Sequence, residues 1–456
     1  MRKVLAAVRA ADPARLAVSD ADGVLTYGAL ADAVAACAGR LADAPATIGL
    51  MMPRSRAHVV ADLALASLGR TIVPLPDFFS PDQLAHVAAD AGIGAVVTVP
   101  ELAARVESLG VPVLDGRGGD AWLVADEPSR RIVYTSGTTG RPKGVVLDEA
   151  AMSASLAGLG RAAGASAADV HLSLLPFSLL LEQLAGVLLP LLAGARVHVA
   201  TSPLEAEAVG ATTSVVVPGL LATWVRALTA MGRRAPSSLR FVAVGGAPVG
   251  EALAAAALDV GLPVHEGYGL SECCSVVAVN RPGQRRAGTV GRPLDGVDVA
   301  IEDGEIVVRG PTVMAGYLGH DAAGGIWRTG DLGRFDPDGN LVVLGRKDDV
   351  VVTPEGRNVH PEWIEPMLLA DPAVRACAVV AGDGGVKAVV VPTDPAAPAD
   401  PGHWLPILVR LSAAAPAYAR PTEVAVVSAD FARAQAFFTP DARPRRRRIA
   451  QILNTR

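Results

Sequence analysis

Short apolar runs alternate with Ala-rich stretches of helical spacing along the first part of the chain. Residues 47–52, 71–75 and 95–99 are short, apolar and bounded by turn residues, which is typical of buried strands. Residues 57–68 and 81–91 lie between these runs and have apolar positions at helical spacing. Strands that alternate with helices predict right-handed βαβ units and a parallel sheet.

The same rhythm returns between residues 214 and 244, and the pattern changes after about Gly283. Asp-Gly pairs at 295–296, 303–304 and 338–339 are strong hairpin signals and predict a small β-rich subdomain. The last hundred or so residues return to a mixed pattern, in which we expect a helix from Pro361 and strands at 377–380 and 386–391.

These patterns predict an α/β protein made of two domains. The N-terminal domain, residues 1–346, would contain the parallel sheets and the small β-rich subdomain. The C-terminal domain, residues 347–456, would be a small α+β domain. We place the boundary near residues 346–349, where the hairpin-rich region ends.

Composition excludes several classes of protein. The chain has 456 residues, of which 51% are hydrophobic and 19% charged, so it can bury a core and is not a disordered chain. A net charge of −5 gives no reason to expect a nucleic acid partner. The longest apolar run, residues 184–195, is shorter than the ~20 residues that span a bilayer. Four cysteines without a Cys-x-x-Cys pair suggest neither zinc nor disulfides, so we expect a cytoplasmic protein.

The segment from Tyr134 to Leu147 has the strongest chemical signal. Residues 135–140 after a predicted strand contain four hydroxyl side chains and two glycines, and Lys143 follows. Backbone amides, hydroxyl groups and a lysine are what a protein uses to hold a polyphosphate. The P-loop of NTPases differs, because it has Gly before the lysine where this chain has Pro142. The alternative is an ordinary polar turn.

This segment closely resembles the phosphate loop of the adenylate-forming superfamily, which includes acyl-CoA synthetases, peptide-synthetase adenylation domains and luciferases. The resemblance continues in order over essentially the whole chain. The other matching segments are Leu-Thr-Tyr-Gly-Ala-Leu at 25–30, Gly-Gly-Ala-Pro at 245–248, Gly-Tyr-Gly-Leu-Ser-Glu at 267–272, Trp-Arg-Thr-Gly-Asp at 327–331 and Gly-Arg-Lys-Asp at 345–348.

The resemblance implies an ATP site. Tyr268 would stack on adenine, Asp331 would accept the ribose hydroxyls with Arg346 nearby, and Glu272 would carry Mg²⁺. Without the resemblance, each residue also has an ordinary interpretation. Tyr268 could be a half-buried core tyrosine, Asp331 a turn residue and Glu272 a solvated glutamate. The implied ATP-binding residues are Thr135, Ser136, Gly137, Thr138, Thr139, Gly140, Gly246, Ala247, Tyr268, Gly269, Ser271, Asp331 and Arg346.

The resemblance also implies a mobile C-terminal domain with its hinge at Asp348. In this family a carboxylate first attacks the α-phosphate of ATP and pyrophosphate leaves. The small domain then rotates, and the acyl group passes to a thiol. Residues 356–365 resemble the segment that lines the thiol tunnel. The alternative for residues 347–349 is a charged surface turn.

The C-terminal tail departs from the family pattern, which has a lysine that bridges the carboxylate and the α-phosphate. Alignment on Thr439 puts Arg443 at that position, and a shifted frame chooses Arg448 instead. No lysine follows Lys387. Arginine keeps the charge but is bulkier and planar. We therefore expect Lys143, Glu272 and Arg443 to be the catalytic residues, against the alternative that 443–448 is a solvated basic tail.

The predicted acyl pocket is apolar. Amino-acid-activating relatives have an aspartate where this chain has Phe177, and an unpaired buried ammonium would cost several kcal/mol, so an α-amino acid is disfavoured. Plain core packing is the alternative for this leucine-rich run, and a small apolar pair at the pocket floor is favoured over a catalytic cysteine for Cys273-Cys274. The expected pocket residues are Phe177, Leu179, Leu180, Gly245, Gly267 and Cys273.

These expectations together predict an acyl-CoA ligase that uses ATP, Mg²⁺ and coenzyme A to activate an apolar carboxylic acid. Three alternatives stay open. The acyl group could pass to a phosphopantetheinyl carrier protein, as in natural-product biosynthesis, or to an amine or hydroxyl. The chain could instead be a non-catalytic nucleotide-binding homologue, since the usual lysine is missing.

Overall fold

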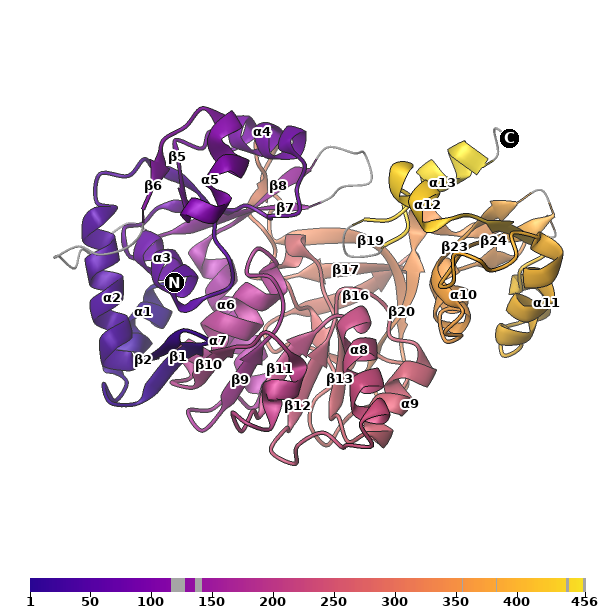
Figure 1. Ribbon diagram of the computed structural model, residues 1–456, viewed down its shortest axis with the longest axis horizontal. Coiled ribbons are helices and arrows are strands. Elements are labelled where there is room, and N and C mark those ends of the chain that lie inside the picture. The colour runs from indigo at the N-terminus through magenta and orange to yellow at the C-terminus, as the bar shows by residue number, and fades with distance from the viewer. Residues whose placement is uncertain (116–127, 136–141, 355, 383, 440–442, 454–456) are drawn as a thin grey trace.

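The computed structural model describes the whole chain except residues 116–127, 136–141, 355, 383, 440–442 and 454–456. A large part is followed by a smaller C-terminal part, which lies beside it at the right of Figure 1. The strand β20 (Leu341–Arg346) leads from one part toward the other.

The first sheet of the large part is parallel from β13 across to β1, and antiparallel pairs extend it at both edges. The strand–helix–strand pattern predicted between residues 214 and 244 lies in this sheet, where two neighbouring parallel strands are connected by one helix. In sheet order its strands are β15 (Arg292–Pro293), β14 (Ala278–Val279), β13 (Val264–Tyr268), β12 (Phe241–Val244), β11 (Thr213–Val216), β9 (Val170–Ser173), β10 (Arg196–Val199), β1 (Leu16–Asp20) and β2 (Gly23–Thr26).

The second sheet is built from the three apolar runs at the start of the chain and the two strands beside the phosphate loop. The runs form parallel neighbours, and the antiparallel hairpin β7–β8 joins them through β4. In sheet order its strands are β18 (Gly316–Tyr317), β8 (Lys143–Leu147), β7 (Arg130–Thr135), β4 (Thr71–Pro74), β3 (Thr47–Met51), β5 (Ala95–Thr98) and β6 (Val113–Leu114).

One set of helices packs between these two sheets and shares a core with both, for example with Ile48 of β3 and Val197 of β10. The long apolar run 184–195 lies in this layer, where it forms a π-helix and a short α-helix. The helices of this layer are α1 (Arg2–Ala10), α2 (Tyr27–Arg40), α3 (Arg56–Ser67), α6 (Glu149–Ala163), the π-helix η2 (Glu182–Leu188) and α7 (Leu189–Leu192).

Other helices cover the outer faces of the sheets. One group packs with strands of the second sheet and the other with strands of the first. The helix predicted from residue 81 begins with a capping box between Ser80 and Gln83. These helices are α4 (Pro81–Asp90), α5 (Pro100–Val106) and η1 (Glu107–Leu109), and then η3 (Pro203–Ala206), α8 (Pro218–Ala230) and α9 (Glu251–Asp259).

The Asp-Gly hairpin signals mark an antiparallel sheet at the end of the large part. Asp303-Gly304 turns β16 into β17, with positive φ at both residues, and Asp338-Gly339 lies between β19 and β20. The predicted β-rich subdomain is confirmed. Its strands are β16 (Asp298–Glu302), β17 (Glu305–Arg309), β19 (Ile326–Phe335) and β20 (Leu341–Arg346).

The C-terminal part has cores of its own, which are formed by residues between 351 and 449. The helix predicted from Pro361 has that proline at its first position. Its elements are η5 (Lys347–Asp349), β21 (Val351–Val352), β22 (Asn358–Val359), α10 (Pro361–Leu368), β23 (Val374–Gly382), β24 (Gly385–Pro392), α11 (Pro401–Leu411), η6 (Ala417–Ala419), β25 (Glu423–Val426), α12 (Ala429–Ala434) and α13 (Arg446–Leu453).

The α/β fold class predicted from the sequence is therefore confirmed. No helix within the described ranges is both long and apolar enough to cross a membrane. The domain boundary at 346/347 and the mobility of the C-terminal part stay predictions.

Candidate active site

The hairpin β7–β8 brings the two ends of the predicted phosphate loop together. Thr135 and Lys143 are partners across the two antiparallel strands, so the connection between them starts and ends at one point. Gly144 is tightly enclosed, because a Cβ there would lie 2.9 Å from Ile132 and 3.0 Å from Tyr134. The predicted phosphate ligands Ser136, Gly137, Thr138, Thr139 and Gly140 fall outside the described residues.

Glu272 lies in a tight turn after β13. The turn is the 3₁₀ helix η4 (Ser271–Cys273), and its Glu272 carbonyl accepts a hydrogen bond from the Met314 amide at 2.8 Å. The Tyr317 hydroxyl donates to Glu272 Oε1 at 2.7 Å, and Lys143 Nζ lies 5.3 Å from the centre of the Tyr317 ring. The structure thus brings together two of the three predicted catalytic side chains through a tyrosine.

Tyr317 was missed by the sequence analysis. The chain has only five tyrosines, so each of them was a candidate for a polar role at the site. However, no local sequence pattern links Tyr317 to Glu272, which lies 45 positions earlier. Burial raises the pKa of the Tyr317 hydroxyl, and the hydrogen bond to Glu272 raises it further. The hydroxyl therefore stays protonated and acts as a donor.

Asp331 is the centre of a second group. Its partner across β19 and β20 is Arg346, whose Nη1 donates to Asp331 Oδ1 at 3.0 Å, and the Tyr268 hydroxyl donates to Oδ2 at 2.6 Å. Burial raises the pKa of the Asp331 carboxyl, while the bonds from Tyr268 and Arg346 act in the opposite direction. A carboxylate has about four acceptor positions. Each oxygen therefore keeps room for a further donor such as a ribose hydroxyl.

The glycine turn after β12 brings backbone without side chains close to β13 and to the segment before the π-helix. A Cβ on Gly245 would lie 3.7 Å from both the Gly267 carbonyl oxygen and Leu181 Cδ2. Gly246 has a φ of +87°, and a Cβ on it would lie 3.5 Å from Val217 and 3.8 Å from Arg443 Nη2. Ala247 follows in this turn, and its side chain is exposed. Because the two glycines have no side chains, a purine or an acyl chain can approach the backbone of this turn closely.

Arg443 comes to this turn from the C-terminal part. Its amide donates to Thr439 Oγ1 and its carbonyl accepts from the Thr439 amide, both at 2.9 Å, so these residues close a small loop. The alternative frame places Arg448 elsewhere, because its guanidinium donates to the Gln435 carbonyl. Arg446 is mostly buried and forms an ion pair with Glu365 at 2.7 Å, so the arginine run is not simply a solvated tail.

The predicted acyl-pocket residues do not all lie at the glycine turn. Phe177 and Leu180 are buried in the central core, and the Phe177 ring packs edge-on against His58. Leu179 is half-buried. The leucine beside Gly245 is Leu181, which the sequence analysis did not select.

Cys273 is fully buried behind Glu272, and burial raises its pKa well above the usual value for a thiol. A thiol in that state is a poor nucleophile. The adjoining glycine, Gly269, packs against the same turn so closely that a Cβ would lie 1.6 Å from the Ser275 carbonyl oxygen.

The predicted hinge residue Asp348 lies in η5, where its exposed carboxylate is 3.4 Å from Arg447. The preceding Lys347 contacts Glu305 of the large part at 3.4 Å. These two consecutive residues, both just after the predicted boundary, are therefore tied by ion pairs to different parts of the molecule.

The described residues contain no group of three or more His, Cys, Asp or Glu side chains that could hold a metal ion. Glu272 supplies one carboxylate beside the predicted phosphate loop. Mg²⁺ favours one or two carboxylates together with phosphate oxygens and water. The residues present therefore fit a magnesium ion that arrives with a polyphosphate.

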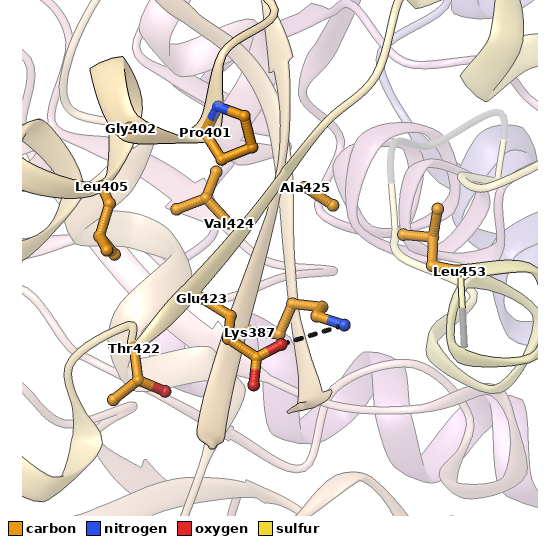
Figure 2. Close-up of a pocket in the computed structure, with 9 residues that line it drawn as sticks. All are labelled: Lys387, Pro401, Gly402, Leu405, Thr422, Glu423, Val424, Ala425 and Leu453. Carbon is orange, nitrogen blue, oxygen red and sulfur yellow. Dashed lines mark ion pairs between the residues drawn. The ribbon is translucent and has the colours of Figure 1, made fainter. Parts of the chain in front are cut away.

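A pocket away from these residues lies on the C-terminal part. Figure 2 shows this hollow of about 430 Å³ between β25, the start of α11 and the end of α13. Leu405 and Leu453 line it together with the ion pair between Lys387 and Glu423, which is 3.1 Å long. None of the predicted site residues lines it.

The fold, together with these groups of side chains, indicates an enzyme that binds a nucleotide. The family model described as "AMP-binding enzyme" matches residues 5–318, and the chain belongs to this family. A 2-succinylbenzoate–CoA ligase of Bacillus cereus is 30% identical over 81% of this chain and 82% of its own length. A feruloyl-CoA synthase of Amycolatopsis is 31% identical over 84% of this chain and 86% of its own.

Solved structures show the same fold. The o-succinylbenzoate CoA synthetase of Bacillus subtilis, in complex with its acyl-adenylate intermediate, has a TM-score of 0.81 at 25% identity and covers 93% of this chain and 94% of its own. The amide bond synthetase of Marinactinospora thermotolerans has a TM-score of 0.81 at 27% identity and covers 99% of this chain and 98% of its own.

Proposed function

We propose that this protein is an AMP-forming acyl-CoA ligase. One observation carries the proposal. Tyr268 ends β13 and Glu272 lies four positions later in the turn. Each side chain is hydrogen-bonded to a different cluster of residues. Tyr268 joins Asp331 and Arg346, which suit a ribose, whereas Glu272 lies with Lys143 beside the predicted phosphate loop. The site thus has a nucleoside end and a phosphate end.

In the first half-reaction a carboxylate oxygen of the acid attacks the α-phosphorus of ATP, the bond to the bridging oxygen breaks, and pyrophosphate leaves. Lys143 and residues 135–140 would bind the phosphates. When bound at Glu272, Mg²⁺ would neutralise phosphate charge. No general base is needed, because a carboxylic acid is already ionised at neutral pH. Catalysis therefore consists mainly of positioning and charge stabilisation.

Arg443 would supply a second cation to this step. Its guanidinium lies at Gly246. Burial raises the pKa of Asp331, and the positive charge of Arg443 acts against this rise. A guanidinium can donate to a carboxylate and a phosphate oxygen from one plane. Arg443 would thus replace the lysine that the family uses.

In the second half-reaction the thiol of coenzyme A attacks the acyl carbonyl carbon, the thioester forms and AMP leaves. This assignment of coenzyme A rests on the CoA ligases among the relatives. The similarity to an amide bond synthetase over nearly the whole chain favours an amine as the second candidate acceptor. A carrier protein stays a third acceptor to test.

The acid is proposed to be apolar. Leu181 and Val217, which face the glycine turn from the large part, carry no charge, and the charged neighbour of this turn is the cation Arg443, which cannot pair with an ammonium. An α-ammonium at this place would lose its hydration without a carboxylate partner. A cytoplasmic location, a rotating C-terminal part and the absence of a nucleic acid partner also stay predictions.

Mass spectrometry tests the proposal. The purified protein is incubated with Mg-ATP and fatty, branched or aryl acids, alone, with coenzyme A, and with an amine. We expect acyl-AMP without an acceptor and acyl-CoA when coenzyme A is present. Acyl-AMP that reacts with the amine only would select the amide-forming function. No adenylate from any acid, despite ATP binding, would favour a nucleotide-binding protein without activity.

A further inference from the structure

Tyr317 lies between two groups of opposite charge. It is on β18, whose partner β8 begins with Lys143, and Tyr317 itself pairs with Val145. Its hydroxyl bonds Glu272 at 2.7 Å, and its ring faces Lys143 Nζ at 5.3 Å. The tyrosine therefore contacts both the proposed magnesium ligand and the proposed phosphate ligand.

The Tyr317 ring is held in place from a third side. Trp327 packs edge-on against it at 5.7 Å, with an interplanar angle of 80°. Strand pairing fixes the backbone, and the Leu318 amide donates to the Gly144 carbonyl at 2.8 Å. The ring cannot turn away without loss of these contacts, so its position does not depend on the hydroxyl.

Lys143 and Glu272 have a strong reason to pair with each other. Opposite unit charges that come within about 4 Å of each other near a protein surface attract each other. Yet in the part of the chain that the structure describes, no ion pair joins them. Each instead contacts an uncharged part of Tyr317: Lys143 lies over the ring face, and Glu272 accepts a hydrogen bond from the hydroxyl. These contacts are weaker than the contact of Lys143 with a phosphate or of Glu272 with a metal ion.

We propose that Tyr317 is a positioning residue that keeps Lys143 and Glu272 apart, so that Mg²⁺ and the phosphates of ATP bind without first breaking an internal ion pair. The inference rests on the proposed ATP site. It assigns Tyr317 to the phosphate end of that site only. The nucleoside end, at Asp331, does not involve it.

Two substitutions separate the functions of the ring and the hydroxyl. Tyr317→Phe removes the hydroxyl and keeps the ring face and the Trp327 contact, so Glu272 becomes free to turn toward Lys143. Loss of one such hydrogen bond should weaken Mg·ATP binding about five- to tenfold. Tyr317→Leu removes both partners and should weaken it further, by about another tenfold.

Calorimetry with Mg·ATP and with AMP in the absence of metal tests the proposal, because AMP occupies the nucleoside end alone. We expect both variants to bind AMP within about twofold of the wild type. They should also need more Mg²⁺ for half-saturation with ATP. Tyr27→Phe is the matched control, since it removes a buried hydroxyl that donates to the Ala195 carbonyl at 2.7 Å, outside the site.

The outcomes are distinguishable. If Tyr317→Phe binds Mg·ATP as the wild type does, or loses AMP and Mg·ATP equally, the positioning function is overturned. If the wild-type protein itself binds neither ligand, the proposed function is wrong. Weaker Mg·ATP binding with intact AMP binding, and an unchanged Tyr27→Phe variant, supports the inference.

Discussion

At the scale of single residues, the site is organised by tyrosine hydroxyls bound to carboxylates. Tyr268 orients Asp331 and Tyr317 orients Glu272, at 2.6 and 2.7 Å. A hydrogen bond to a charged group contributes about 1.5–3 kcal/mol, and more is lost when a buried carboxylate has no donor. Both carboxylates are therefore held in place before a ligand arrives, which reduces the reorganisation that binding requires.

The first prediction concerns Arg443. If its guanidinium stabilises charge on the α-phosphate, Arg443→Ala should slow adenylation about a hundredfold, which is typical for loss of one charge-stabilising donor. Arg443→Lys should be no faster than the wild type. Single-turnover formation of acyl-AMP measures this, and the thioester step from preformed acyl-AMP should change by less than about threefold.

Arg448→Ala is the control, because Arg448 belongs to the same basic run but donates to the Gln435 carbonyl. It should leave the adenylation rate unchanged. A large gain in rate for Arg443→Lys would contradict an adapted arginine and indicate a decayed site.

At the scale of elements, the turn after β13 depends on the absence of a side chain at Gly269. A Cβ there would lie 1.6 Å from the Ser275 carbonyl oxygen, and a backbone atom cannot move aside easily. Cys274 and Ser275 already have positive φ values of 55° and 82°. This turn carries Glu272, so its shape and the proposed metal ligand are linked.

The second prediction is that Gly269→Ala destabilises the protein by about 3 kcal/mol or more, because the overpacking involves backbone. Urea unfolding at neutral pH measures the free energy. Gly219→Ala is the matched control, since a Cβ at Gly219, in α8, meets nothing within 4 Å. It should be neutral or slightly stabilising. Equal effects of the two substitutions would show that the turn relaxes.

The π-helix η2 begins with a buried carboxyl group. Glu182 accepts from the Ser173 hydroxyl at 2.5 Å, and a Cβ on Gly186 would lie 2.5 Å from Glu182 Oε1. Burial raises the pKa of Glu182 to about 8. The folded protein therefore keeps a proton there that the unfolded chain releases above about pH 4.5.

The third prediction follows from this raised pKa. The stability that the bound proton provides is complete below the unfolded pKa and is lost as pH rises through the folded pKa. Unfolding free energy should fall by up to about 1.4 kcal/mol per pH unit between about pH 5 and pH 8 because of this group. Glu182→Gln should remove that slope in urea titrations, whereas Glu207→Gln, at an exposed side chain, should retain it.

The same π-helix shows what the sequence could and could not predict. The strand runs and the Asp-Gly hairpins depend on local patterns, and the structure contains them at nearly the same residues. Which leucine lies beside Gly245 depends on how the chain packs just before the π-helix, and no periodic pattern in the sequence gives that packing. Leu181 faces the glycine turn, whereas Leu180 is buried in the core. Likewise, no local pattern connects Tyr317 to Glu272.

At the scale of the whole molecule, the described contacts between the C-terminal part and the large part lie at several separate points. Arg443 lies at Gly246, and Lys347 contacts Glu305. On α10, Pro366 lies against Gly250 and Glu362 against Gly345. We expect these contacts to form in one half-reaction and to break in the next. Because Arg443 lies at Gly246 in this arrangement, we assign the arrangement to adenylation.

The fourth prediction tests that assignment at Gly250. This residue is the N-cap of α9 with φ near −67°, so its backbone tolerates a side chain, but a Cβ would lie 2.9 Å from Pro366 Cβ. Gly250→Val should therefore push α10 away and slow adenylation about tenfold or more, because small displacements of a catalytic group reduce rates strongly. Conversion of preformed acyl-AMP to acyl-CoA should be unchanged, since the C-terminal part would have left this contact. Equal slowing of both half-reactions would mean that the two parts do not rearrange between them, and a hinge at Asp348 would then have no function to perform.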